Sequence, residues 1–196
     1  MHWWTAALVG VCAATSLALS VAPVATLVGR RALVKDIHVA AGLFLLVPLL
    51  VGRAGPWARQ LKADLRLLDR FDAVDRHWLR SFGRHPFATS AKFHPGQKLN
   101  AALTAAALVS LFATGVVLRW FEPFPIGVRR GATFVHDWTA FLFAVLMIGH
   151  TLKALADGEA MRGMVRGDVD RTWAATHHPR WTEDEPQQTR EQEQAR

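Results

Sequence analysis

The stretch VHDWTAFLFAVLMIGH, residues 135–150, decides the fold, because it places two histidines inside one long apolar segment. Ionisable side chains are costly inside a membrane helix, so they usually serve a function there. His136 and His150 are fourteen positions apart, close to four turns of helix. Both imidazoles therefore share one helix face, about 21 Å apart along the axis at 1.5 Å per residue. One helix would thus place a histidine near each side of a hydrocarbon core about 30 Å thick.

Composition also favours a membrane protein, since 51% of the 196 residues are hydrophobic and they concentrate in four stretches. Each stretch supplies most of the ~20 apolar residues that a spanning helix needs. Buried helices of a soluble protein are the alternative, but two stretches lack charged side chains over 20 or more positions. We therefore predict an all-α integral membrane four-helix bundle. The approximate ends of the stretches are 3–28, 33–51, 99–120 and 132–156.

The basic residues predict the orientation of the chain. The connection 53–98 carries ten Lys and Arg residues and the part 153–196 carries seven, whereas the other two connections carry three each. By the positive-inside rule, both termini and the 53–98 loop are expected in the cytoplasm. This bias and contact with anionic lipid account for the formal charge of +7, so no nucleic-acid partner is expected. We predict a transmembrane domain at 1–162, including loop 53–98, and a cytoplasmic tail at 163–196.

Two polar segments have distinct patterns. The loop stretch KADLRLLDRFDAVDRHWLRSF, residues 62–82, predicts an amphipathic helix that lies on the inner membrane surface or is solvated without a partner. The Gln/Glu/Arg run at 183–196 cannot form a core and is predicted to be mobile. With one cysteine, Cys12, the chain has no disulfide and no Cys-x-x-Cys-His motif for covalent haem attachment.

The nine histidines sort by their predicted depth in the membrane. Soluble segments need no ligand role for an exposed histidine, so four are predicted at the surface: His77, His85, His177 and His178. His94 immediately precedes the third span. The other four lie at or inside spans and form two pairs by depth: an inner pair, His2 with His150, and an outer pair, His38 with His136.

Two bis-histidine pairs in an apolar bundle favour a planar macrocycle, because its ring nitrogens supply the other four ligands of the metal. Small residues beside the histidines (Ala40, Ala41, Gly42 and Gly149) would let such a ring approach the backbone. Haem is therefore favoured on spacing and depth alone. Histidines that only pack, other metals such as copper, nickel or zinc, and proton relays remain alternatives.

Four motifs in order resemble one known family. They are His2-Trp3 at the start of the first stretch, KFHPGQKLN at 92–100, the fourteen-residue spacing in 135–150, and RTWAATHHPRW at 171–181. The last is the most specific, because nothing in membrane physics requires that string. Together they resemble the gamma subunit of membrane-bound formate dehydrogenase, a di-haem b-type cytochrome of the bacterial inner membrane. The family usually has a basic segment before His-Trp, so we expect the native chain to start upstream of Met1 and to carry Lys or Arg there.

The resemblance implies two non-covalent b haems, held by the two histidine pairs, and a site for menaquinone or ubiquinone beside the inner haem. Gly96 and Gln97 match the family's Gly-Gln at that site, while His94 replaces its common small amide. His94 would titrate near neutral pH and could relay a proton. The alternative is that Gly96 and Gln97 only form a helix entry. The implied partners are an iron–sulfur (beta) subunit and a molybdenum or tungsten catalytic (alpha) subunit, docked on the outer face.

These features predict electron transport across the membrane, from an outer iron–sulfur centre through two haems to quinone. The chain would not itself oxidise formate; it would be the quinone-reducing subunit of an oxidoreductase in respiration. Two alternatives remain. The same architecture serves hydrogenases and other periplasmic oxidoreductases. A haem-free small transporter or scaffold is more distant, because the spans contain no paired acidic residues and no broken-helix symmetry.

Overall fold

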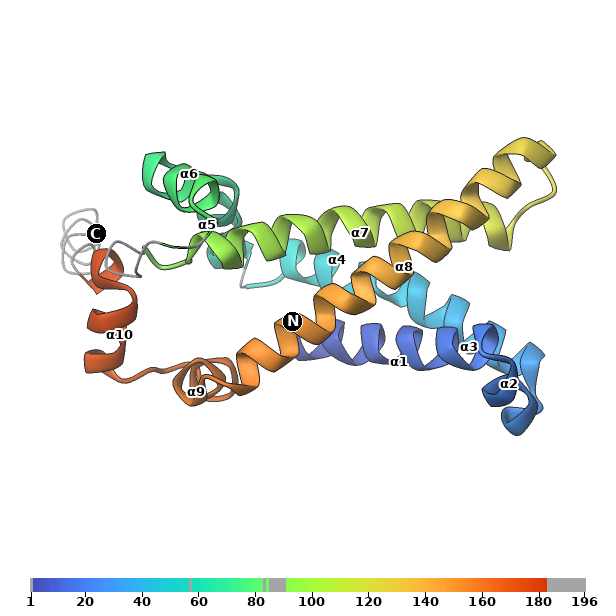
Figure 1. The fold of residues 1–196 in the computed structure, drawn as a ribbon, viewed down its shortest axis with the longest axis horizontal. Coiled ribbons are helices and arrows are strands. Elements are labelled where there is room, and N and C mark those ends of the chain that lie inside the picture. The colour runs from blue at the N-terminus through green and yellow to red at the C-terminus, as the bar shows by residue number, and fades with distance from the viewer. Residues whose placement is uncertain (1, 57, 83, 85–90, 183–196) are drawn as a thin grey trace. The chain divides into compact units, whose positions relative to one another are not determined.

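The computed structural model describes residues 2–56, 58–82, 84 and 91–182, and these form helices joined by turns and short connections (Figure 1). The predicted mobile run 183–196 and His85 lie outside the described residues. The helices are α1 (His2–Ser20), α2 (Ala22–Val28), α3 (Arg31–Phe44), α4 (Leu46–Ala54), α5 (Ala58–Asp69), α6 (Ala73–Arg80), α7 (Pro95–Arg119), α8 (Ile126–Leu155), α9 (Gly158–Arg166) and α10 (Arg171–His177).

Four helices within the described residues are long and apolar enough to cross a membrane: α1, α3 continued by α4, α7 and α8. The shortest has 19 residues, or about 28 Å at 1.5 Å per residue, which matches a hydrocarbon core of about 30 Å. The predicted all-α class and the four spans are therefore confirmed. The cytoplasmic placement of both termini stays a prediction.

The first predicted stretch is divided in the structure, because α1 ends at Ser20 and α2 is a separate short helix. Pro23 lies at the start of α2 and has no N–H to donate to the carbonyl of Leu19, four residues earlier. Arg31 supplies the missing donor, since its Nη1 donates to the Leu19 oxygen at 3.0 Å. The helix end is thus satisfied by the side chain that begins α3.

The second span is interrupted at Leu45, between α3 and α4. Pro48 explains the interruption, because it cannot donate to the Phe44 carbonyl and its ring crowds that oxygen. Leu45 itself keeps helical backbone angles, with φ −60° and ψ −21°, so the chain direction is largely preserved. The two helices together form one 24-residue span, Arg31–Ala54.

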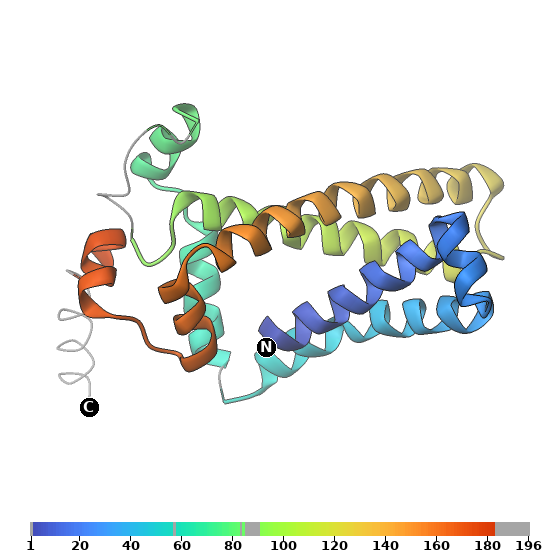
Figure 2. The same ribbon diagram turned by 60° about the horizontal axis from the view of Figure 1, so that its bottom comes forward.

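The chain forms two compact units. Unit 1 comprises 1–63 and 106–144, and unit 2 comprises 64–105 and 145–196. All four spanning helices contribute to unit 1, where α1 and α3 lie side by side (Figures 1 and 2). The predicted boundary between membrane domain and tail, at 162/163, falls inside α9 and stays a prediction.

The surface of unit 1 is that of a membrane protein. On α8, Trp138, Phe141 and Leu142 are each more than half exposed, as expected for side chains that face lipid rather than a protein core. Few apolar side chains among the unit's described residues are buried: Val34, Ala41, Ala132 and Phe143. Many large apolar groups on the outside and a small buried core argue against a soluble helical domain.

The loop stretch 62–82 contains parts of two helices, α5 and α6, where the sequence predicts one amphipathic helix. Asp72 begins α6 by accepting a hydrogen bond from the Asp75 N–H at 2.9 Å. The Asp75 carboxylate accepts the Asp72 N–H in return, also at 2.9 Å, which completes a capping box. This cap starts a new helix and divides the predicted one.

Candidate metal centre

The structure brings the predicted outer pair together inside unit 1. His38 lies on α3 and His136 on α8, and their ring centroids are 6.4 Å apart with an interplanar angle of 69°. Both side chains are partly buried in the apolar part of the unit. Helices far apart in the sequence therefore present two imidazoles to each other.

Each of these imidazoles is also hydrogen-bonded to a threonine. Thr15 of α1 lies 2.9 Å from Nδ1 of His38, measured from its Oγ1. Thr114 of α7 lies 2.9 Å from Nδ1 of His136, again from Oγ1. The cluster thus takes one residue from each of the four spans, and sequence reasoning missed both threonines.

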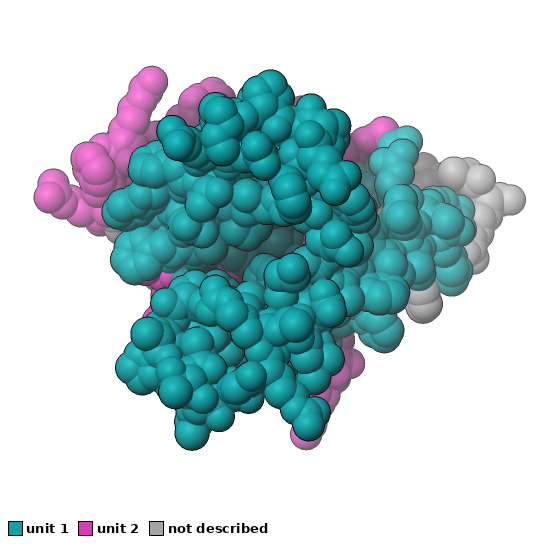
Figure 3. All heavy atoms as spheres, turned by 90° about the vertical axis from the view of Figure 1, so that its right-hand side faces the viewer, with its two compact units in different colours: residues 1–63, 106–144 teal, residues 64–105, 145–196 magenta. Residues whose placement is uncertain are grey.

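A glycine packs directly against one ring of the outer pair. Gly115 lies directly against His136, since a Cβ there would be 3.5 Å from the ring atom Cε1. A Cβ on Gly42, in the predicted small-residue stretch, would meet no atom within 4 Å. Figure 3 shows that the face of unit 1 turned toward the viewer is hollowed between an upper and a lower group of atoms.

The predicted inner pair is divided between the units. His2 begins α1 in unit 1, where its ring contacts Trp3 at 5.5 Å between centroids. His150 lies near the end of α8, in unit 2, with its Nδ1 3.4 Å from the amide nitrogen of Asn100. The pairing of His2 with His150 therefore stays a prediction.

The predicted quinone residues form the start of α7. The His94 N–H donates to Oε1 of Gln97 at 2.8 Å, and Nδ1 of His94 accepts the Gly96 N–H at 3.1 Å. This pattern is a variant of the capping box, in which Gln97 accepts from the N-cap backbone while the histidine accepts the N–H of the second helical residue. A Cβ on Gly96 would be 3.2 Å from Nδ1 of His94 and 3.5 Å from Trp78, so the close packing favours glycine. All three residues thus have a role in the helix entry, whether or not quinone binds there.

The environment of His94 holds its imidazole neutral. The pKa of His94 is lowered from 6.5 to about 4, chiefly by burial and also by the positive charges of Lys153 and His178, against an opposing effect of Asp75. Its side chain is only 7% exposed. An imidazole with a pKa near 4 is uncharged at neutral pH, so the expected titration of His94 near neutrality is wrong, and a proton relay through its charged form is disfavoured.

The lowered pKa predicts a pH-dependent stability. Between pH 6.5 and about 4 the unfolded chain binds a proton that folded His94 does not, so stability should fall as the pH falls through this window. The loss by about pH 5 should be at most ~2 kcal/mol, at 1.36 kcal/mol per pKa unit. His94→Asn keeps an N-cap residue but cannot titrate, so unfolding curves of this variant should show a smaller change with pH. Equal pH slopes in both proteins would contradict the assignment.

A buried ion pair supports the same helix entry. Nζ of Lys98 donates to Oδ2 of Asp75 at 2.6 Å and to the Arg70 carbonyl at 2.8 Å. The two charged side chains are only 7% and 6% exposed. This pair ties α7 to α6, and nothing in the spacing of Asp75 and Lys98 would have revealed it.

The tail motif RTWAATHHPRW contacts the residues that precede α6 and α7 in unit 2. Asp170 caps α10 by accepting the N–H groups of Thr172 and Trp173. Nδ1–H of His178 donates to the Ala91 carbonyl at 2.8 Å, and Arg180 donates to Asp72 at 3.0 Å. His178 is only 8% exposed, so its predicted surface position is wrong, because the sequence could not show that the tail folds back.

A family model described as prokaryotic cytochrome b561 matches residues 1–167. The chain belongs to the prokaryotic cytochrome b561 family. This cytochrome is also similar to curated proteins named as formate dehydrogenase cytochrome subunits, which confirms the resemblance predicted from the four motifs.

Three relatives illustrate that similarity. The formate dehydrogenase cytochrome b556 subunit of Haemophilus influenzae is 34% identical over 104 residues, 52% of this chain and 44% of the relative. The nitrate-inducible cytochrome b556(Fdn) subunit of Escherichia coli K12 is 28% identical over 119 residues, 56% of this chain and 55% of the relative. The cytochrome b556(fdo) subunit of the same strain is 34% identical over 95 residues, 47% and 45% of the two chains. The cytochrome therefore spans about half the length of the curated relatives it matches.

The family implies b-type haem, and the spacing of the outer pair can be compared with that of two imidazoles on one metal. A metal–imidazole bond is about 2.0–2.1 Å long, so two imidazoles facing each other across one metal have centroids about 6.3 Å apart. The observed separation is 6.4 Å. The donor set fits as well, because two neutral imidazoles are the usual axial ligands that leave four positions for the macrocycle.

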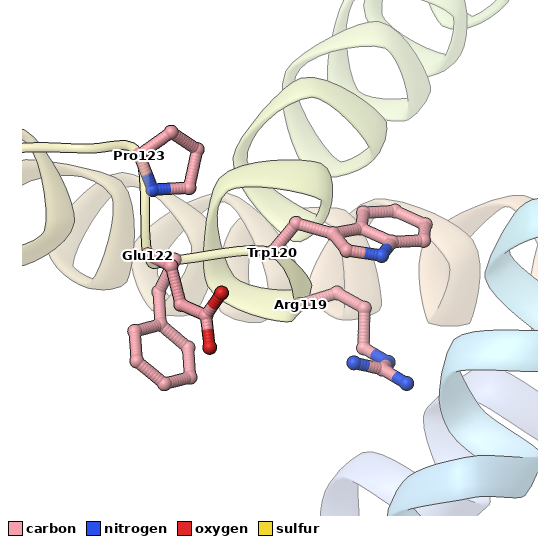
Figure 4. Close-up of a pocket in the computed structure, with 5 residues that line it drawn as sticks. Arg119, Trp120, Glu122 and Pro123 are labelled. Carbon is pink, nitrogen blue, oxygen red and sulfur yellow. The ribbon is translucent and has the colours of Figure 1, made fainter.

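The turn between α7 and α8 carries a shallow depression that is separate from the histidines. Arg119, Trp120, Phe121, Glu122 and Pro123 line it. Figure 4 shows the Trp120 ring and the Arg119 side chain extending in the same direction, and the guanidinium carbon lies 5.6 Å from the ring centroid. None of these five residues belongs to the predicted sites of this cytochrome.

Proposed function

We propose that this chain is the membrane subunit of a formate dehydrogenase complex and transfers electrons from an outer iron–sulfur subunit to membrane quinone. The observation that carries the proposal is the outer pair, two facing imidazoles 6.4 Å apart between helices α3 and α8 of a cytochrome b561-family chain. The formate dehydrogenase assignment is supported by the names of the curated relatives, of which the chain spans about half.

In this proposal the chain holds two b haems. His38 and His136 hold the outer haem, and His2 and His150 hold the inner one. When bound, haem b supplies one-electron redox chemistry, which no side chain here provides. The histidines hold the iron, and the apolar helices exclude water from it. Moving one electron across a bacterial inner membrane costs or yields about 2.3 kcal/mol per 100 mV.

The proposed partners are the subunits that would oxidise formate and deliver its electrons to this chain. The chain offers no residues for formate oxidation in the proposal, so a molybdenum or tungsten subunit performs that reaction and an iron–sulfur subunit delivers the electrons. Both dock on the outer side, where the turn after Arg119 and helix α2 lie between spans. The positive-inside charge distribution supports this side as the non-cytoplasmic one.

A pyridine haemochrome assay tests the proposal. Purified protein should contain two b haems per chain, and formate, but not hydrogen, should reduce them in membranes that contain the native complex. Protein without Soret absorption would contradict the cytochrome function and favour a scaffold or transporter. Reduction by hydrogen instead of formate would assign the chain to a hydrogenase.

We also propose that quinone binds at the entry of α7, beside the inner haem. Gln97 is exposed, and its Oε1 accepts the His94 N–H, so the amide N–H₂ is the group that could donate to a quinone carbonyl. His94 is neutral there and takes part through its position rather than its charge. The buried Lys98–Asp75 pair ties this entry to α6.

Gln97→Leu should keep both haem spectra and slow haem reoxidation by quinone at least about tenfold, equivalent to ~1.4 kcal/mol of barrier. Gln97→Glu separates the two roles of this residue, because glutamate still accepts the His94 N–H but has no amide donor. Stopped-flow reoxidation should be slow in both variants. If the haems of the Gln97→Glu variant were reoxidised at the wild-type rate, Gln97 would act only as a helix cap and the quinone would bind elsewhere.

A further inference from the structure

The hydrogen atoms of two threonine hydroxyls are already committed within their own helices. Oγ1 of Thr15 donates to the Val11 carbonyl at 2.7 Å, four residues earlier on α1. Oγ1 of Thr114 donates to the Ser110 carbonyl at 2.7 Å, four residues earlier on α7. Both distances are typical of a full O–H···O hydrogen bond. A hydroxyl has one hydrogen, so neither threonine has a second proton to donate.

Each threonine therefore accepts from the imidazole that it contacts, beside a backbone carbonyl that also faces the ring, that of Cys12 for His38 and that of Leu111 for His136. The Thr15 hydroxyl lies 2.9 Å from Nδ1 of His38, and the Thr114 hydroxyl lies 2.9 Å from Nδ1 of His136. An oxygen that has given its hydrogen to a carbonyl offers only lone pairs, so Nδ1 carries the proton in both rings. A neutral imidazole protonated at Nδ1 has its free lone pair on Nε2.

We propose that Thr15 and Thr114 are the positioning residues of the outer haem, which fix both histidines as Nε2 ligands and set the electron density that they donate to iron. This inference rests on the proposed haem site. It adds two residues, one from α1 and one from α7, to the ligands on α3 and α8. The same contact, with the same two distances, occurs on both sides of the metal position.

The direction of the effect follows from the acceptor. A hydrogen bond from Nδ1–H makes the imidazole more basic and orients its ring. A more basic ligand stabilises ferric iron relative to ferrous iron, so removal of the acceptor should raise the reduction potential. An alternative is that each threonine only packs beside its histidine. Packing alone predicts no change in potential for an isosteric substitution.

The experiment uses the full-length, haem-loaded protein. Thr15→Val and Thr114→Val replace the hydroxyl by a methyl group of similar size. Each should shift the oxidised-to-reduced ratio of the outer haem about tenfold toward the reduced form, which is about 59 mV for one electron. The inner haem should keep its potential. Thr15→Ser and Thr114→Ser retain the acceptor and should restore wild-type values.

Thr133→Val is the matched control. Thr133 lies on α8, the helix of His136, and like the other two threonines it donates to the carbonyl four residues earlier, here that of Arg129. Its hydrogen bond is exposed, and none of the described hydrogen bonds joins it to a histidine. It should leave both haems unchanged. A second readout is the EPR spectrum of the outer ferric haem, which depends on the angle between the two imidazole planes and should change only in the Thr15 and Thr114 valine variants.

The outcomes separate this inference from the proposed function. Wild-type protein without haem would refute the haem site itself. Haem-loaded valine variants with unchanged potential and EPR spectrum would overturn the role of the threonines and leave the haem site intact. Loss of the outer haem alone in a folded valine variant would support the role.

A measurement on the wild-type protein covers the case in which a valine variant does not fold. Reduced six-coordinate haem is diamagnetic, so nitrogen-15 NMR of histidine-labelled protein can locate the ring protons. His38 and His136 should each show a slowly exchanging Nδ1–H and no Nε2–H. An Nε2–H on either ring would overturn the inference.

Discussion

His136→Ala should remove the outer haem and leave the inner one, and His150→Ala should do the reverse. Each proposed haem depends on its own pair of imidazoles, and one remaining axial histidine does not retain a macrocycle in an apolar bundle as two do. The haem content should fall by half in each variant. A redox titration should show one b centre in place of two, with a different centre lost in each protein.

His77→Ala provides the control for this pair of variants. His77 is exposed on α6, so its removal should leave both centres in place. The second outer ligand gives an internal check, because His38→Ala should reproduce the His136→Ala spectrum. Loss of both centres from both folded variants would argue against two independent sites. Loss of neither would leave His136 and His150 as packing residues.

Asp75→Asn should destabilise unit 2 by about 3 kcal/mol, because it leaves the Lys98 ammonium buried without its counter-charge. The pair is 2.6 Å apart and nearly inaccessible to water. Asparagine preserves the cap of α6, because its Oδ1 can still accept the Asp72 N–H. Denaturant unfolding in detergent micelles, compared with the wild type, measures the loss.

The chain contains a more accessible ion pair for comparison. Lys92 and Asp64 are 2.7 Å apart, yet their side chains are 31% and 29% exposed. Asp64→Asn should therefore cost no more than about 1 kcal/mol, since water replaces the lost partner. Similar losses for Asp75→Asn and Asp64→Asn would show that burial does not strengthen the Lys98 pair.

Periodicity and length made the spans and the outer pair predictable. A hydrophobic stretch of sufficient length predicts a spanning helix, whichever helices pack against it. The depth of His38 and His136 then follows from their positions along their stretches. The break after Ser20 could also have been predicted, because Pro23 removes a donor in the middle of an apparent 26-residue stretch. The pattern of apolar residues contains no information on a missing N–H, so it predicts one helix over 3–28.

The residues around the histidines could not be predicted, since they depend on how helices rotate against one another. Nothing distinguishes Thr15 and Thr114 from Thr26 or Thr133 in the sequence, and all four donate to a carbonyl four residues earlier. Only the fold shows which two face an imidazole. The cap at His94 did leave a signal, because a side-chain acceptor followed three residues later by Gln97 is the spacing of a capping box.

The contacts of the tail have a consequence for the order in which the protein is made. His178 and Arg180 bind Ala91 and Asp72, residues that are translated 87 and 108 positions earlier. The ribosome therefore completes α6 and the entry of α7 well before their partners exist. This part of unit 2 can therefore reach its final form only after residues 178–180 have been made, later than all four spans.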